Sequence, residues 1–166
     1  MLIFEKVLGL SRIQIRLNQN ETVSAANLTQ IKEIISRLIQ FEPIQYILGE
    51  TEFYGCTFKV DPSVLIPRQE TEELADWIVR DNKHLNPAIL DIGTGSGCIP
   101  ISLVKNLPGA SADGWDISPD ALLIAEENAL KNKVKVSFQC VDILNPVAAR
   151  HHEKYDIVVS LSLIHI

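Results

Sequence analysis

The sequence of 166 residues lacks the features that mark several protein classes. It has no run of about 18 apolar residues, so we expect no membrane-spanning helix. It does not begin with a basic segment followed by an apolar run, so we expect no signal peptide. It has no basic block, and its net charge is −6, so we expect no direct contact with nucleic acid. A hydrophobic fraction of 46% with 22% charged residues is typical of a globular chain rather than a disordered one.

Cysteine is scarce, and the sequence has only Cys56, Cys98 and Cys140. Their spacing fits neither a zinc site nor a disulfide framework, so we predict no metal site. Reduced thiols are the rule in the cytoplasm, which is where we expect this protein.

The first part of the chain predicts a small helical segment. We expect a short helix over residues 1–10 and an irregular polar stretch over residues 11–22. Apolar residues then recur with the period of an amphipathic helix over residues 24–40, whose start Ser24 or Asn27 can cap.

A hairpin and a further helix are expected next. Two short β-type runs flank Gly55-Cys56, which predicts a hairpin over residues 51–61. A helix is expected over residues 71–80, with Thr71 as its N-cap. Its apolar stripe would be Leu74, Trp77 and Ile78.

From residue 88 onward, strand-like and helix-like segments alternate. The expected strands are 88–92, 112–117, 134–140 and 155–160, and the expected helices are 98–106 and 118–131. Strands joined by helices through short connections form parallel sheets. We therefore predict a doubly wound α/β domain.

A glycine-rich loop, Gly93-Thr94-Gly95-Ser96-Gly97, lies between an expected strand and an expected helix. A dinucleotide-binding fingerprint would require glycine where this sequence has Cys98. Asp91, two residues before the loop, would repel a pyrophosphate but suits a ligand with a positively charged end. S-adenosyl-L-methionine is such a ligand, because it carries a sulfonium and an ammonium group.

Further acids follow the next two strands. Asp116 follows Gly97 by 19 residues and could accept hydrogen bonds from both ribose hydroxyls. Asp142 and Ile143 could bind the amino group and the ring face of adenine. Each acid alone has an ordinary structural explanation, but all of them fall at the edge where parallel sheets bind ligands.

Two stretches outside the loop are more distinctive, EPIQYILG over residues 42–49 and VLIPRQETE over residues 64–72. Together with residues 52–55, 91–97 and 116–122, they make residues 1–160 similar to the release factor glutamine N-methyltransferases, the PrmC or HemK family. The glycine loop alone would match many methyltransferases.

This resemblance implies a fold and a division of the chain. It implies an α/β, Rossmann-like methyltransferase domain, incomplete and with about four parallel strands, preceded by a small helical segment and a β-hairpin. Residues 1–48 would be part of a substrate-recognition domain, residues 49–63 a hairpin linker, and residues 64–160 the cofactor-binding half.

The resemblance also implies a reaction and its partners. Family members transfer a methyl group from S-adenosyl-L-methionine to the side-chain amide of the Gly-Gly-Gln glutamine in peptide chain release factors. We therefore expect release factors as protein substrates in the cytoplasm, with neither nucleic acid nor membrane as a direct partner.

Residue by residue, the expected cofactor site combines the family's positions with the acids found above. Its members are Asp91, Gly93, Thr94, Gly95, Ser96, Gly97, Asp116, Asp142 and Ile143. The position of Ile143 is often aromatic in relatives. Arg68 and Thr71 lie in a stretch that borders the cofactor cleft of relatives.

The sequence departs from the family after Ser160, where relatives carry an Asn-Pro-Pro-Tyr motif. We therefore predict no catalytic residue here and expect the chain as given to be inactive. Residues 161–166 match the translation of a DNA-library adapter, so we expect a non-native tail. The alternatives are another amino-methyltransferase acting on nucleic acid or ribosomal protein, and an inert cofactor-binding fragment.

Overall fold

The computed structural model describes residues 2–145 and 154–161, so residues 162–166 of the expected tail lie outside the described residues. The chain divides into two units, residues 1–49 and residues 50–166, called here the N-terminal and C-terminal units.

The N-terminal unit contains four helices among its described residues, α1 (Leu2–Leu8), α2 (Arg12–Leu17), α3 (Ala25–Ile39) and α4 (Ile44–Leu48). The prediction of an irregular stretch over residues 11–22 was wrong for α2. Ser11 and Gln14 form a reciprocal capping box that satisfies the backbone at its start. Ser24 caps α3 as expected.

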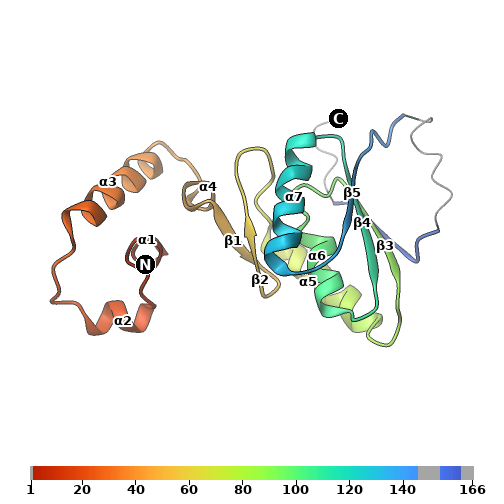
Figure 1. Ribbon diagram of the computed structural model, residues 1–166, viewed down its shortest axis with the longest axis horizontal. Helices are drawn as coiled ribbons and strands as arrows, with labels where there is room; N and C mark the ends of the chain where they lie inside the picture. Colours follow the sequence, from red (N-terminus) through yellow and green to blue (C-terminus); the bar gives the residue numbers. More distant parts are fainter. Residues whose placement is uncertain (1, 146–153, 162–166) are drawn as a thin grey trace. The chain divides into compact units, whose positions relative to one another are not determined.

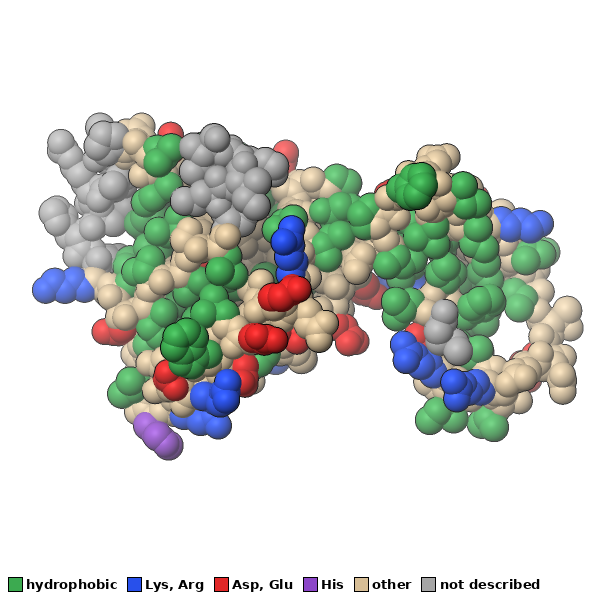
Figure 2. All heavy atoms as spheres, turned by 180° about the vertical axis from the view of Figure 1, so that it is seen from behind, with side chains coloured by type: hydrophobic (Ala, Val, Ile, Leu, Met, Phe, Trp, Pro, Cys, Tyr) green, Lys and Arg blue, Asp and Glu red, His purple; other side chains and the backbone are tan. Residues whose placement is uncertain are grey.

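Apolar side chains cover much of the surface of the N-terminal unit in Figure 2. Among the described residues of this unit, Ile31 is the one hydrophobic residue that is buried.

The C-terminal unit begins with an antiparallel hairpin of β1 (Glu50–Phe53) and β2 (Cys56–Lys59). Its turn is Tyr54-Gly55, one residue earlier than the expected Gly55-Cys56. Both turn residues have positive φ, 45° and 73°, which matches the twist that a tight hairpin needs. Cys56 is instead a buried strand residue opposite Phe53.

Helix α5 (Gln69–Asp81) begins two residues earlier than expected, with Arg68 at the N-cap position. Thr71 therefore lies inside the first turn, and its prediction as the N-cap was wrong. The expected apolar stripe was also partly wrong. Trp77 is 60% exposed, whereas Ala75 and Val79 are buried.

The remaining elements alternate in the predicted order. They are β3 (Ala88–Ile92), α6 (Cys98–Asn106), β4 (Ser111–Asp116), α7 (Pro119–Asn132), β5 (Ser137–Cys140) and β6 (Ile157–Val159). The strands form one parallel sheet in the order β5-β4-β3-β6, which confirms the α/β prediction. Figure 1 shows α5, α6 and α7 on the same side of this sheet.

The main core lies between the sheet, these helices and the hairpin. Phe53 and Phe58 of the hairpin are almost fully buried and pack edge to face, with ring centroids 6.1 Å apart. They share one cluster with Ile89 of β3 and Ile101 of α6. The hairpin is therefore part of the core of the C-terminal unit. Within the described residues, no helix is long and apolar enough to cross a bilayer.

Candidate functional site

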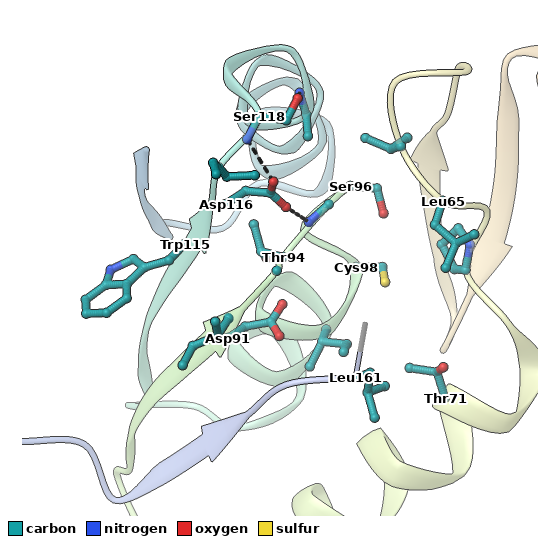
Figure 3. Close-up of a pocket in the computed structure, with 18 of the residues that line it drawn as sticks. Leu65, Thr71, Asp91, Thr94, Ser96, Cys98, Trp115, Asp116, Ser118 and Leu161 are labelled. Atoms are coloured by element: carbon teal, nitrogen blue, oxygen red, sulfur yellow. Dashed lines mark hydrogen bonds between the residues drawn. The ribbon is translucent and has the colours of Figure 1, made fainter. Parts of the chain in front are cut away.

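A cavity of about 760 Å³ opens at the carboxyl ends of β3, β4 and β5. This volume is within the range of small-molecule sites. Four groups of residues line it: most of residues 63–71, the glycine loop with its neighbours, the ends of β4 and β5 with the start of the following α7, and Leu161 after β6 (Figure 3).

The sequence predicted a set of residues for a cofactor site and for the cleft beside it. Most of these residues line this one cavity. They are Arg68, Thr71, Asp91, Gly93, Thr94, Gly95, Ser96, Asp116, Asp142 and Ile143. Arg68 is the basic residue of this lining within the described part of the chain, and Glu70 adds a fourth acid. The sequence thus identified residues that the fold brings together, although it did not predict which of them contact one another.

Gly97 does not line the cavity as the structure describes it. It precedes α6 with a φ of 74°, and a Cβ atom there would lie 3.0–3.2 Å from Ile101, Ala125 and Phe138. Glycine is needed at this position for the left-handed backbone and for the close packing of the loop against its neighbours.

Asp91 at the end of β3 is 1% exposed, and its Oδ2 atom has no hydrogen-bond partner among the described residues. Burial raises the pKa of Asp91 to about 7; the nearby Thr94 hydroxyl opposes the shift, and the charge of Asp116 adds to it. A buried carboxylate without a partner is costly, so a cation placed against it would be strongly favoured.

Asp116 at the end of β4 has its two carboxylate oxygens engaged. Oδ2 accepts from the Gly95 amide at 2.8 Å, and Oδ1 accepts from the Ser118 amide at 3.0 Å (Figure 3). Each oxygen can accept a second hydrogen bond, so Asp116 can hold the loop and bind a ligand hydroxyl. The amides of Gly93 and Thr94 also donate to the carbonyl of Trp115, which fixes the loop to β4.

The end of β5 provides a turn with an apolar side. Asp142 accepts from the amide of Leu144 at 3.0 Å, and Ile143 and Leu144 both line the cavity. Ile117 after β4 lines it as well and is 64% exposed. An exposed apolar surface beside a carboxylate suits a flat, polar-edged ring.

Sequence reasoning missed several apolar lining residues. They are Val64, Leu65, Ile66, Ile92, Ile99, Trp115, Ile117, Ala121, Val141, Leu144 and Leu161. Some belong to the stretch over residues 64–72 that carried the family resemblance, but nothing in their chemistry marked them. Their place in the lining depends on the fold.

Cys56, Cys98 and Cys140 are all free in the described part of the chain. Cys98 lines the cavity, but burial raises the pKa of its thiol to about 12, which leaves it protonated and unreactive. No cluster of potential metal ligands occurs in the two described ranges.

Comparisons with known proteins agree with this geometry. Residues 1–49 match the PrmC N-terminal domain family, and residues 89–166 match the methyltransferase domain family. A release factor glutamine methyltransferase of Bacteroides thetaiotaomicron is 46% identical over 160 residues, which cover 96% of this chain and 57% of that protein. One of Flavobacterium psychrophilum is 43% identical over 163 residues, which cover 96% of this chain and 56% of that protein.

The resemblance to the release factor glutamine methyltransferases is confirmed. The chain spans about half the length of the curated relatives it matches.

Solved structures show the same Rossmann-like α/β fold. The 16S rRNA N2 G1207 methyltransferase of T. thermophilus has a TM-score of 0.59 at 20% identity, covering 70% of this chain and 33% of that one. The ribosomal protein L11 methylase of Lactobacillus delbrueckii has a TM-score of 0.51 at 30% identity, covering 62% of this chain and 51% of that one.

Proposed function

We propose that the cavity at the ends of β3, β4 and β5 binds S-adenosyl-L-methionine, and that the chain carries the cofactor-binding part of a release factor glutamine N-methyltransferase that acts in the cytoplasm. The observation that carries the proposal is Asp91, a buried carboxylate with an unpartnered oxygen, on the wall of a cavity large enough for a nucleoside.

Four groups of lining residues would hold the cofactor. Asp91 would face its cationic end, and Arg68 offers the charge that its carboxylate needs. Asp116 would accept from the ribose hydroxyls while it holds the loop. Asp142 with Ile143 would bind the adenine edge and face.

The cofactor supplies an electrophilic methyl group on a sulfonium sulfur. The acceptor in a release factor would be a glutamine amide nitrogen, a poor nucleophile because its lone pair is delocalised. Transfer to such an atom depends chiefly on holding the reacting groups in line. The lining residues would serve that need by fixing the cofactor with the carboxylates of Asp91, Asp116 and Asp142 and with Arg68.

Calorimetric titration of the chain with S-adenosyl-L-methionine, S-adenosylhomocysteine and NAD tests the cofactor. We expect saturable binding of the first two and none of NAD, because Asp91 and Cys98 disfavour a pyrophosphate. Binding of NAD alone would contradict the proposal.

The methyl acceptor is tested in a chimera. Residues 1–160 replace the matching part of the Bacteroides relative, and transfer of a labelled methyl group to a release factor is measured. We expect labelling that disappears when the glutamine of the Gly-Gly-Gln loop is changed to alanine. A chimera that binds the cofactor without labelling the factor would contradict this acceptor.

A second candidate is methylation of ribosomal protein or nucleic acid, because methylases of both kinds share the fold. The higher identity to the release factor enzymes favours the first candidate. The same chimera, offered ribosomal protein L11 and rRNA, separates the two.

A further inference from the structure

Asn128 of α7 is a buried polar residue that none of the site predictions used. Its side chain is 0% exposed. Its Oδ1 atom accepts from the Lys59 amide at 2.6 Å, and its Nδ2 atom donates to the carbonyls of Lys59 and Ser96, both at 3.0 Å. Both amide hydrogens and the oxygen are therefore used, and no other orientation of the carboxamide would satisfy all three partners.

The first two bonds fix the outer edge of the hairpin. In the described structure, β2 pairs only with β1, so the other edge of β2 has no strand beside it. Asn128 supplies the donor and the acceptor that a neighbouring strand would offer to Lys59. The residues that follow, Ser63 to Arg68, form one wall of the cavity, so the position of the hairpin bears on that wall.

The third bond fixes the glycine loop. Ser96 is 2% exposed and lines the cavity, and its carbonyl accepts from Asn128. The preceding residue, Gly95, donates its amide to Asp116 on the opposite side. The loop is thus held from β4 by Asp116 and from α7 by Asn128.

We propose that Asn128 is a positioning residue that holds the glycine loop and the hairpin together. It would thereby fix the positions of the loop and of the cavity wall that follows the hairpin, between which the methionine part of the cofactor would bind. The expected effect of Asn128 on cofactor affinity rests on the proposed function. Its effect on the position of the glycine loop does not.

Asn132, one turn further along α7, offers a matched control. It is 7% exposed, and its Nδ2 atom donates to the carbonyls of Thr57 in the hairpin and Asn128 in the helix. It therefore contacts the same hairpin edge from the same helix but makes no hydrogen bond to the glycine loop. An ordinary structural role predicts similar effects for the two asparagines, whereas a positioning role predicts different ones.

The experiment compares Asn128→Ala and Asn132→Ala with the parent chain. Amide hydrogen exchange is followed at Gly95 and Gly97, whose amides donate to Asp116 and to the Thr94 carbonyl. We expect Asn128→Ala to speed exchange at these amides by about tenfold beyond the change in global exchange, because one hydrogen bond to the loop is lost. We expect Asn132→Ala to change exchange at these amides by no more than it changes global exchange.

Calorimetry with S-adenosylhomocysteine provides the second readout. Asn128→Ala should weaken binding by about tenfold, and Asn132→Ala by less than about threefold. Asn128→Asp should weaken it further, because a carboxylate would face the carbonyls of Lys59 and Ser96. If the alanine variant does not fold, Asn128→Ser, which can restore one bond, is read in the same way with smaller changes.

The outcomes separate the two proposals. Equal effects of the two alanine variants on loop exchange would overturn the role of Asn128. If the parent chain binds no S-adenosylhomocysteine, the proposed function fails, and loop exchange alone decides whether Asn128 holds the loop.

Discussion

The ends of β3 and β4 lie side by side in the sheet, yet they present their carboxylates in opposite ways. Asp91 on β3 is fully buried with an unpartnered oxygen, and its pKa is raised. Asp116 on β4 is partly exposed and accepts two backbone amides. One acid is held in an unfavourable environment that a cation would relieve, and the other builds the loop. The same residue type is therefore left with an unpartnered oxygen at one strand end and anchors the glycine loop at the next.

Removing the carboxylate of Asp116 should have the largest effect. In Asp116→Ala the amides of Gly95 and Ser118 lose their acceptor, so the glycine loop and the start of α7 are both released. The loss of two hydrogen bonds to a charged group, at about 1.5–3 kcal/mol each, should lower the stability of the chain. Because the loop is displaced and the ribose hydroxyls lose their acceptor, affinity for S-adenosylhomocysteine should fall by about 100-fold or more. Calorimetry and thermal unfolding measure the two effects. Asp116→Asn, which keeps one acceptor, should lose less of both.

Asp91→Asn should separate stability from binding. Removing a buried carboxylate that lacks a full set of partners should raise the melting temperature of the unliganded chain at pH 8. The same change removes the charge that faces a cationic ligand, so affinity for S-adenosyl-L-methionine should fall by about tenfold or more. A variant that is both less stable and unchanged in affinity would show that Asp91 has a structural role and does not face the ligand.

The stability of the unliganded chain should depend on pH through Asp91. Because the pKa is raised from 3.8 to about 7, the folded chain binds a proton that the unfolded chain releases between these values. The contribution of Asp91 to stability should therefore decrease as pH rises from about 4 to about 7. Thermal unfolding is measured across this pH range in the parent and in Asp91→Asn. The contribution of Asp91 is the part of the dependence of stability on pH that the variant lacks. Identical slopes in both proteins would contradict the raised pKa.

Much of this arrangement could be predicted from local sequence. The glycine loop and the alternation of strands and helices after residue 88, including the helix expected from residue 118, depend on residues close together in the chain. The grouping of Asp91, Asp116 and Asp142 could be predicted because parallel strands bring their carboxyl ends to one edge of the sheet.

What sequence reasoning missed depends on distant residues. Gly97 packs against Phe138, and Asn128 bonds to Lys59, 69 residues away. Such contacts follow from the fold and leave no periodic pattern.

The errors at α2 and the hairpin turn were local, and they arose from the capping box at Ser11 and from the positive φ of Tyr54. At α5 the helix begins before Thr71, although Arg68 at the N-cap position makes no side-chain capping bond.

Proton release on binding tests the central claim most directly, which is that the buried Asp91 receives the cationic end of S-adenosyl-L-methionine. Titration of the chain at pH 6 in buffers of different ionisation enthalpy gives the number of protons released. With a pKa of about 7, Asp91 is mostly protonated at pH 6. We therefore expect release of nearly one proton on binding, an affinity that rises by about tenfold between pH 6 and pH 8, and neither effect in Asp91→Asn. Binding with no proton release, or with the same release in the variant, would contradict the account.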